Sequence, residues 1–252
     1  MLFQEERSLN SMKSILRSIG KAALRILAIL LVIAVLIAAY FSYKGYRMYQ
    51  DAVRETPVSE LGRTIRDNGH YVRYRELPDI YIDAVISAED KRFFTHPGID
   101  PIAIGRAVWK DIISLSFVEG GSTITQQIAK NQLFTQEKKV ERKFAEIFAA
   151  LALEREYSKE QLFEIYVNTI YFGSGYYGIY EAAQGYYGKN PSELTDYEAI
   201  MLAGIPNAPS NYSPDASMEL ARKRMSLVLE KMVNCRKITE TRANEILGNA
   251  NK

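Results

Sequence analysis

The sequence predicts a mainly α-helical domain that follows a single transmembrane helix, and three features indicate this fold class. An apolar run from Ala22 to Phe41 is long enough to cross a bilayer. In the segments after it, apolar residues recur at spacings of three and four, which is typical of helices with one buried face. Glycine, proline and capping residues divide these segments into successive helices, and few segments alternate as strands do.

The N-terminal run reads AALRILAILLVIAVLIAAYF, and its one charged residue is Arg25, whose long side chain can reach the headgroups. Such a helix is about 30 Å long, which matches the apolar core of a bilayer. A cleaved signal peptide is the competing interpretation, but its apolar part usually spans only about 7–15 residues. We therefore predict an uncleaved anchor at 22–41 that follows a cytoplasmic tail at 1–21.

Basic residues predict the orientation of this anchor. Those at or before the run are Arg7, Lys13, Arg17, Lys21 and Arg25, and those after it are Lys44, Arg47 and Arg54. The flank with the denser positive charge usually stays in the cytoplasm. We therefore expect a cytoplasmic N-terminus and an extracytoplasmic domain.

Composition excludes several other classes of protein. The 252 residues, of which 47% are hydrophobic and 25% charged, are enough for one substantial domain and an anchor. A net charge of +2 argues against a dedicated nucleic-acid binder. The single cysteine, Cys235, cannot form an intramolecular disulfide, and with only His70 and His96 beside it we expect no zinc cluster.

After the anchor we predict a polar stalk at 42–65, because Pro57 and Gly62 interrupt it and it shows no sustained period. A short strand is expected at 71–74, and a helix then runs through Ile82 until Pro97 and Gly98 end it. The next helix begins at Pro101 and reaches about Leu115. Two glycines at 120–121 precede a further helix, for which Ser122 is the predicted N-cap.

The longest periodic helix is predicted from Glu137 to Tyr157. Its expected buried stripe consists of Val140, Phe144, Ile147 and Leu151. The later helices are predicted at 162–172, 199–205, 215–234 and 239–247, the first two behind the capping boxes Ser158/Gln161 and Thr195/Glu198, with a proline-punctuated loop at 206–214. Residues 173–178 match GxGxxG, but we reject a dinucleotide site because a helical segment precedes them, and we expect a glycine-rich connection among packed aromatic residues.

The stretch IDAVISAEDKRFFTHPGID places an acid on an apolar helix face. Its apolar residues Val85, Ile86 and Phe93 follow helical spacing. Glu89 lies on the same stripe, whereas Asp90 points more nearly outward. A carboxylate partly withdrawn from water holds a proton more readily, which suits a general acid or base near neutral pH. The alternative is a structural acid that pairs with Lys or Arg.

The stretch GGSTITQQIAKNQ is rich in hydrogen-bond donors for the start of a helix. Thr123, Gln127 and Lys130 share one face, and Gly121 and Ser122 offer backbone N–H groups. This set suits a phosphate or a sugar. The alternative is an ordinary capped helix with a solvated polar face.

An Arg–Glu pair stands on the long helix, where Arg142 and Glu146 are four residues apart beside the small residues Ala149 and Ala150. A ligand could approach this face closely. The alternative is a surface ion pair, which contributes only a few tenths of a kcal/mol.

Five stretches occur in order along the chain: ISAEDKRFFTHPGID, GGSTITQQIAKNQ, ERKFAEIFAALALE, EIYVNTIYFGSGYYG and MLAGIPNAPSNYSP. Together they resemble the peptidoglycan glycosyltransferases, the family that includes the glycosyltransferase domain of class A penicillin-binding proteins. The resemblance covers about Tyr71 to Asn234. It implies a lysozyme-like, two-lobed helical domain, which we place at 66–252. Because the chain ends soon after the match, we expect the monofunctional, membrane-anchored type.

The resemblance also implies site residues. The essential glutamate of the family falls on Glu89, with Gly98 and Asp100 completing its motif, and Glu146 matches the second catalytic carboxylate. The implied substrate-binding residues are Asp90, Phe93, His96, Ser122, Thr123, Gln127, Lys130, Asn131, Arg142 and Lys143. The departures are Phe94 where Tyr is frequent and Ile128 where Leu is frequent, and neither puts the implied chemistry in doubt.

The implied reaction is the polymerisation of lipid II, a disaccharide-pentapeptide on polyprenyl pyrophosphate, into glycan strands. Glu89 would accept the proton of the attacking hydroxyl, while Lys130 and Arg142 would stabilise the leaving pyrophosphate. Glu146 would orient Arg142 or help to bind a divalent cation, Mg or Mn. The sequence leaves both roles of Glu146 open, and this cation is the one cofactor under consideration.

The implied setting is the bacterial cell membrane. The partners would be lipid II, the growing glycan strand and the bilayer, with other cell-wall synthesis proteins as further candidates. An apolar cluster is expected either to face the membrane or to form plain core, and it consists of Ile112, Ile113, Leu115, Phe117 and Val118. Two rival functions are a lysozyme-like glycan-cleaving enzyme and a non-enzymatic, membrane-tethered scaffold for wall synthesis.

Overall fold

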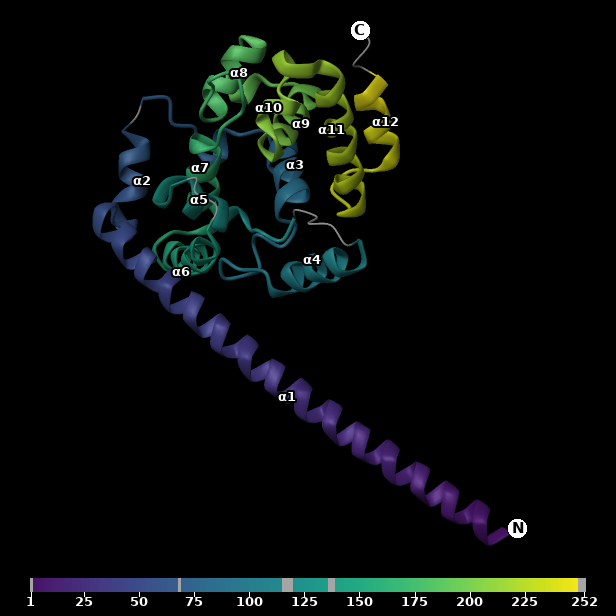
Figure 1. Cartoon of the computed structure of the whole chain (residues 1–252). Coiled ribbons are helices and arrows are strands. Elements are labelled where there is room, and N and C mark those ends of the chain that lie inside the picture. Colours follow the sequence, from purple (N-terminus) through teal and green to yellow (C-terminus); the bar gives the residue numbers. More distant parts are fainter. Residues whose placement is uncertain (1, 68, 115–119, 136–138, 249–252) are drawn as a thin grey trace.

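One continuous helix, α1 (Leu2–Glu55), leads from the N-terminus into a domain built from helices (Figure 1). The computed structural model describes residues 2–67, 69–114, 120–135 and 139–248. Among these residues the only β-type pairing is an isolated bridge between Tyr171 and Tyr177. The mainly α-helical class predicted from the sequence is therefore confirmed.

The N-terminal part of α1 fits the predicted membrane anchor. The stretch Arg17–Glu55 is long and apolar enough to cross a membrane, and no part of its most apolar window is buried inside the protein. In Figure 1 this part of α1 extends away from the domain with no other helix beside it. An apolar helix that the protein itself leaves uncovered needs an apolar solvent, which a bilayer provides.

The prediction of a polar stalk at 42–65 is wrong in its structure. Helix α1 continues without a break to Glu55, and α2 (Val58–Arg66) follows after Pro57. This part of α1 packs along α6 (Val140–Glu156). Its helical pattern is hard to see in the sequence because the buried residue of the packed face is a glycine, Gly45, with polar side chains around it.

The core of the domain has two centres. In one, α3 (Asp79–Glu89) packs on α9 (Asp196–Gly204) and α11 (Pro214–Asn234). In the other, α5 (Ile124–Leu133) packs on α6 and on α7 (Lys159–Thr169). The largest fully buried side chains include Tyr81, Phe93, Phe163, Tyr166 and Ile200.

The remaining elements are α4 (Pro101–Ser114), α8 (Ile179–Tyr187), α10 (Pro209–Tyr212), α12 (Glu240–Gly248) and the 3-10 helices at Tyr74–Glu76, Pro191–Glu193 and Ile205–Asn207. Two predicted capping boxes are confirmed. Ser158 and Gln161 cap α7, and Thr195 and Glu198 cap α9. Their hydroxyls accept the N–H groups that the first helical turn leaves unpaired.

Two local predictions are wrong. The N-cap of α5 is Thr123 rather than Ser122, because the Thr123 hydroxyl accepts the N–H of Gln126 and the Gln126 side chain accepts the N–H of Thr123. The strand expected at 71–74 is absent from this described segment. Extended residues there lead directly into the 3-10 helix Tyr74–Glu76.

The predicted buried stripe of the long helix is also wrong. Val140 is 57% exposed, and Phe144, Ile147 and Leu151 are only partly buried. The face of α6 that enters the core instead carries Ala145, Glu146, Ala149, Ala150 and Leu153. Small residues allow α5 to approach closely, so the alanine face lies inward although it is less apolar than the predicted stripe.

The glycine-rich segment 173–178 is a connection between helices, as predicted. Gly173 and Gly178 both have positive φ, at 85° and 87°. A Cβ on Gly178 would lie 2.7 Å from the carbonyl oxygen of Asn168, and one on Gly173 would lie 2.7 Å from the Cβ of Ser213. Only glycine fits either position, because both the backbone conformation and the space exclude a side chain.

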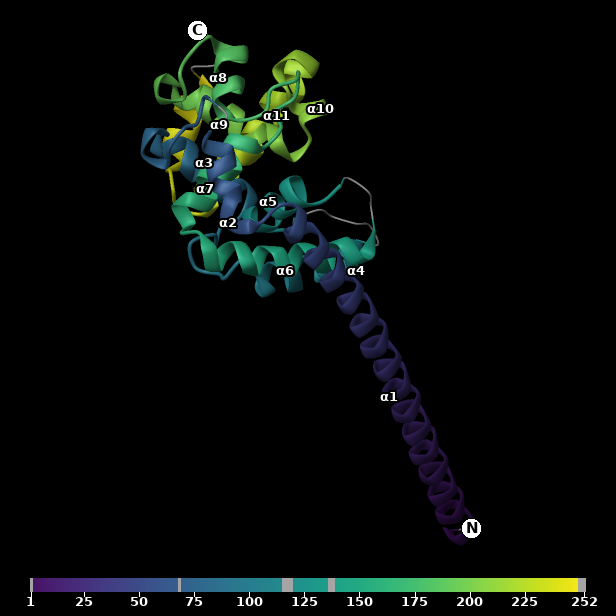
Figure 2. The same ribbon diagram turned by 90° about the vertical axis from the view of Figure 1, so that its left-hand side faces the viewer.

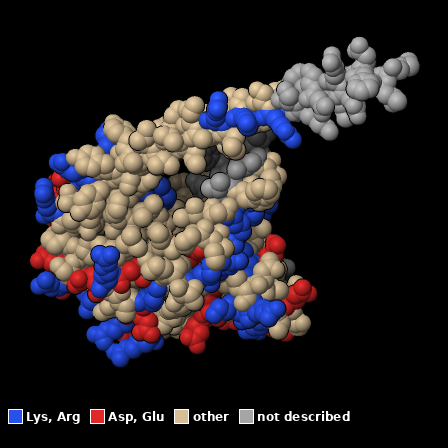
Figure 3. Space-filling model, turned by 90° about the horizontal axis from the view of Figure 1, so that it is seen from below, with Lys and Arg blue, Asp and Glu red and all other residues tan. Residues whose placement is uncertain are grey.

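One side of the domain lies next to the exposed part of α1. Figures 1 and 2 place α4 and α6 at this side, and α8, α9 and α10 at the opposite end. Seen from below, the face beside α1 consists mostly of uncharged residues with scattered Lys and Arg, and Asp and Glu lie mainly toward the other edge (Figure 3). This face suits a lipid surface.

Helix α4 contributes large exposed apolar side chains, since Ile102, Trp109 and Ile113 are 66%, 65% and 66% exposed. Tryptophan is enriched where proteins meet the membrane interface. Ile113 belongs to the apolar cluster predicted from the sequence, and its exposure excludes plain core for this residue. The side chain of Ile112 and the residues Leu115, Phe117 and Val118 lie outside the described part of the chain.

Asp100 provides a test of the fold at the start of α4. Its carboxylate pairs with Arg92 and accepts the N–H of Ala103 at 2.9 Å. Although burial acts to raise it, the pKa of Asp100 is lowered by the Arg92 hydrogen bond and the Ala103 N–H. We predict that Asp100→Ala lowers the free energy of unfolding by about 1–3 kcal/mol at neutral pH.

A lowered pKa means that Asp100 stabilises the folded state fully above its unfolded value of 3.8 and less as the pH falls through the folded value. The difference between wild type and variant should therefore shrink below pH 3.8. Urea unfolding in detergent micelles measures it, with the exposed Asp67→Ala as control. A difference that stays constant over this range would contradict the role given to the charge.

Candidate active site

Glu89 is the last residue of α3, and its carboxylate is 10% exposed. Its Oε2 accepts a hydrogen bond from Nε2 of Gln127 at 2.9 Å, and its Oε1 lies 3.5 Å from Nη2 of Arg224. Gln127 belongs to α5 and Arg224 to α11, so three helices converge on this carboxylate. The two donors fix the position of this carboxylate.

Sequence reasoning missed Arg224, which lies 135 positions after Glu89. Its side chain is 9% exposed, and its Nε also donates to the carbonyl of Gly204 at 3.3 Å. On α11 it stands on the buried stripe that includes Ala221 and Val228. A charged residue on an apolar stripe was the signal that identified Glu89, and the same rule applied to 214–234 identifies Arg224.

Lys231 lies two helical turns after Arg224 on α11, and it contacts the end of α3. Its Nζ donates to the carbonyl of Ala88 at 2.6 Å. Burial lowers the pKa of Lys231, and the positive charge of Arg224 lowers it further. Two cationic side chains of α11 thus surround the end of α3 that carries Glu89.

Asp90 and His96, both predicted to bind substrate, form a buried network behind Glu89. Asp90 accepts the N–H of Ile124 at 3.0 Å and lies 2.9 Å from Nε2 of His96. Because Nδ1 of His96 accepts the N–H of Gly98 at 3.1 Å, the ring proton must be on Nε2, which donates to Asp90. These side chains are 6% and 7% exposed and join α3 to the first residue of α5.

Phe93 and Thr123 support the same loop from inside. Phe93 is fully buried, and Nζ of Lys159 lies 4.6 Å above its ring. The Thr123 hydroxyl donates to the carbonyl of Gly98 at 2.6 Å and is 2% exposed. In this structure Asp90, Phe93, His96 and Thr123 therefore hold the loop in place rather than line an open surface, because their polar groups are already paired within the protein.

Three partly exposed residues of the predicted set lie further along α5. Gln127, Lys130 and Asn131 are partly exposed and share one face, since they stand three and four residues apart. Lys130 has no hydrogen bond or ion pair to another described residue. Its ammonium is therefore available to an anion, and it stands one turn along α5 from Gln127, which contacts Glu89.

A second group of charges stands on α6. Glu146 is 1% exposed; its Oε2 accepts from Nζ of Lys143 at 2.7 Å, and its Oε1 lies 3.4 Å from Nε of Arg142. Lys143 also donates to the hydroxyl of Ser122 at 2.8 Å, and Nη1 of Arg142 donates to the carbonyl of Thr135 at 3.1 Å. The contact of the buried Arg142 Nε with Glu146 is an ion pair without hydrogen-bond geometry, so this donor is still unpaired within the described structure.

This arrangement separates the two roles considered for Glu146. Both oxygens of its carboxylate face cations, which fits a residue that orients Arg142 and Lys143. A divalent cation would have to displace one of these partners. Among the described residues, no group of three His, Cys, Asp or Glu side chains is placed to hold a metal ion. The residues present do not fit a metal in this arrangement.

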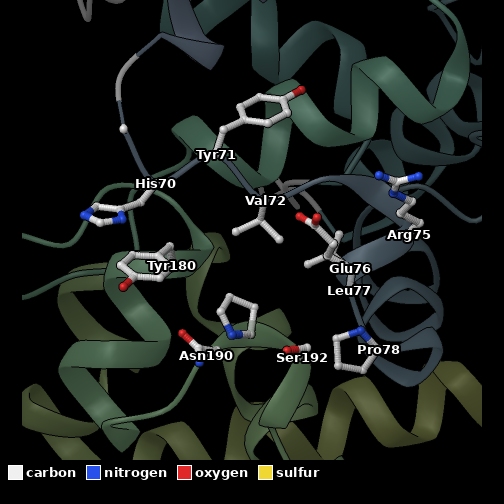
Figure 4. A pocket seen from close by; sticks show the side chains of 12 residues that line it. His70, Tyr71, Val72, Arg75, Glu76, Leu77, Pro78, Tyr180, Asn190 and Ser192 are labelled. Carbon is white, nitrogen blue, oxygen red and sulfur yellow. The ribbon is translucent and has the colours of Figure 1, made fainter.

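A cavity of about 680 Å³ lies elsewhere in the domain, between the segment 69–78 and the residues Tyr180 and 190–192. Figure 4 shows the rings of His70 and Tyr180 against each other, with Arg75 and Glu76 on the opposite wall. The two rings are stacked with centroids 4.2 Å apart. None of the predicted site residues lines this cavity.

Comparison with known proteins shows the family of the chain. The family model described as "Transglycosylase" matches residues 54–233. Penicillin-binding protein 1F of Bacillus subtilis is 44% identical over 173 residues, which cover 69% of this chain and 24% of that protein. Penicillin-binding protein 1A of Vibrio cholerae is 38% identical over 226 residues, 85% of this chain and 27% of that protein. Penicillin-binding protein 1A of Aquifex aeolicus is 45% identical over 163 residues, which cover 65% of this chain and 22% of that protein.

Fold and site together define a helical domain behind an apolar N-terminal helix, with a carboxylate at the end of α3 and cations on the neighbouring helices. Since the family match covers most of the sequence, the chain belongs to the transglycosylase family. It spans about a quarter of the length of the curated relatives that it matches.

Substitution of a buried supporting residue and substitution of a partly exposed residue should have different effects on the free energy of unfolding. Asp90→Ala removes the acceptor of two buried donors, so the free energy of unfolding should fall by about 2–4 kcal/mol. Lys130→Ala removes a side chain that has no partner among the described residues, and the change should stay within about 0.5 kcal/mol. Urea unfolding followed by circular dichroism measures both. Equal destabilisation by the two variants would contradict the division into supporting and exposed residues.

Proposed function

We propose that this domain polymerises lipid II into peptidoglycan glycan strands by inverting glycosyl transfer, with release of polyprenyl pyrophosphate. The observation that carries the proposal is the position of α5. Its Gln127 holds the Glu89 carboxylate at 2.9 Å, and its Lys130, three residues later, presents a cation on the same face. A base and a phosphate-binding group thus flank one surface, as a transfer from a sugar pyrophosphate requires.

In this reaction Glu89 accepts the proton of the 4-hydroxyl of the acceptor N-acetylglucosamine as that oxygen attacks C1 of the donor N-acetylmuramic acid. The bond between C1 and the pyrophosphate oxygen breaks, and its electrons leave with the pyrophosphate. Arg224 and Gln127 hold the carboxylate in place for this proton transfer. Without them the carboxylate would sample other rotamers at the end of α3, with a loss of geometry.

The charge that develops on the pyrophosphate needs cations that are already in place. Lys130 provides a point charge, and Arg142 provides a planar group that can bind two oxygens together. Glu146 holds Arg142 and Lys143 from behind, at 3.4 Å and 2.7 Å. A buried carboxylate with cations on both oxygens keeps the two side chains from spreading when no substrate is bound.

The membrane gives the substrate and the enzyme a common surface. A polyprenyl tail stays in the bilayer, so a tethered domain meets its substrate at a high effective concentration. We place α1 across the membrane with its N-terminus in the cytoplasm and the domain outside, since the denser basic flank precedes the apolar run. The exposed Ile102, Trp109 and Ile113 of α4 then rest on the outer leaflet.

Glu89→Gln tests the proton acceptor. The amide keeps the size of the side chain but cannot take up a proton, so polymerisation of lipid II should fall by about 10²-fold or more. Gel separation of the glycan products from purified lipid II measures this, with the exposed Glu160→Gln as control. Undiminished polymerisation would remove Glu89 from the mechanism. Cleavage of isolated cell walls without polymer formation by the wild type would favour a lysozyme-like hydrolase instead.

Lys130→Ala and Arg142→Ala test the groups assigned to the pyrophosphate. Each variant should lose about 10²-fold in turnover, because a preorganised cation is missing when charge develops on the leaving group. The exposed Lys223→Ala should keep its turnover. Thermal unfolding of Lys130→Ala should match that of the wild type, whereas Arg142→Ala also removes a partner of the buried Glu146 and should be less stable but still folded. If both variants polymerise lipid II normally, the pyrophosphate site lies elsewhere.

A further inference from the structure

Helices α1 and α6 meet at a point where only glycine fits. Gly45 of α1 is buried, and a Cβ at this position would lie 2.5 Å from Cβ of Phe144. The same Cβ would lie 2.7 Å from the carbonyl oxygen of Glu141 and 2.9 Å from the backbone nitrogen of Ala145. Two of these three neighbours are backbone atoms, which cannot rotate away. The two helices are therefore in backbone-to-backbone contact at Gly45.

Further contacts extend this packing along α1. Nζ of Lys44 lies 3.6 Å from Oε1 of Glu141. The ring of Phe148 contacts the rings of Tyr46 and Tyr49, with centroids 5.3 Å and 6.3 Å apart. We call this contact the α1–α6 seam, and its residues are Lys44, Gly45, Tyr46 and Tyr49 of α1 and Glu141, Phe144, Ala145 and Phe148 of α6. Because α1 has no break between the anchor and the seam, the domain is docked on its anchor rather than suspended from it.

The position of the seam sets a depth relative to the membrane. Gly45 follows the end of the predicted span at Phe41 by four residues, a rise of about 6 Å. The headgroup layer of a bilayer is roughly 5–8 Å thick on each side. The turn of α6 that touches Gly45 therefore lies at headgroup level, which is also where a lipid pyrophosphate carries its charge. Arg142 and Lys143 follow Glu141 directly in this turn.

We propose that the α1–α6 seam is a positioning element that holds Arg142 and Lys143 at headgroup depth, and that Gly45 is its positioning residue. The ligand at this depth is a polyprenyl pyrophosphate, an identity that rests on the proposed function. The seam contributes by geometry alone, since none of its residues takes part in the reaction. A displacement of even 1 Å at a catalytic group can lower a rate by about 10²-fold.

Gly45→Ala tests the seam, and Gly20→Ala is a matched control. Both glycines lie in α1, and both exchanges raise helix propensity, but a Cβ on Gly20 meets no atom within 4 Å. The full chain is compared in lipid vesicles, which impose a membrane plane, and in detergent micelles, which do not. The measured quantities are the rate of lipid II polymerisation and the binding of a polyprenyl pyrophosphate.

The expected result is a loss of about tenfold or more in vesicles for Gly45→Ala, with little change in micelles, and no change in either for Gly20→Ala. Phe148→Ala, which removes the ring contacts without adding a clash, should show the same vesicle-specific loss. Equal activity of Gly45→Ala and Gly20→Ala in vesicles would overturn the proposal, and so would an equal loss in vesicles and micelles, which indicates general damage to the domain.

A zero-length carbodiimide crosslink between Lys44 and Glu141 reports the docked seam directly, because the two groups are 3.6 Å apart. It should form in the wild type and in Gly20→Ala and be lost in Gly45→Ala. The proposed function and the proposed role of the seam can be tested separately. If the wild type makes no polymer, the proposed function fails, and pyrophosphate binding in vesicles against micelles still decides whether the seam positions the cations.

Discussion

The carboxylate of Asp90 joins the two helices on which the whole site depends. It follows Glu89 at the end of α3 and accepts the first N–H of α5, so that the proton acceptor and Gln127 meet. A buried carboxylate has few ways to be stable, and here His96 and the helix N-terminus together provide its partners. Residues that look like substrate ligands in the sequence are thus needed first to build the surface on which a substrate can bind.

Two carboxylates of this domain, Glu146 and Glu89, are buried in different surroundings. Glu146 is enclosed by Lys143 and Arg142, whereas Glu89 has one distant cation, Arg224, and remains 10% exposed. Both oxygens of the Glu146 carboxylate are thus occupied by cations of its own helix. Among the described residues Glu89 has one ion contact, at 3.5 Å, and its side chain is the more exposed of the two carboxylates, at 10% against 2%.

Patterns within one helix predicted much of the fold and of the site, whereas contacts between distant segments could not be predicted. The capping boxes of α7 and α9 depend on residues three apart, and the structure has them as predicted. The helix that was expected to run until Pro97 instead ends at Glu89, so Phe93 follows it in a turn and the predicted stripe is wrong beyond Glu89. The stripe rule marks Arg224 as a buried charge on α11, but nothing local in the sequence pairs residue 224 with residue 89. The prediction that Asp90 points outward is wrong for a similar reason, since its partner Ile124 is separated from it by 34 positions.

The wrong prediction for α6 has a different cause. The apolar periodicity is present in this helix, but the face that it marks does not lie in the protein core. A stripe of apolar residues reports only that one helix face avoids water. On α6 that face includes Val140, which is 57% exposed, and Phe144, which packs on Gly45 of the anchor helix. Next to a bilayer, lipid and an anchor helix can cover such a face. The opposite face of α6, which carries the alanines and Glu146, then packs in the core. The exposed Trp109 and Ile113 of α4 fit the same environment. Apolar periodicity in a membrane-tethered domain therefore identifies two surfaces, the core and the lipid contact, and the sequence alone does not tell them apart.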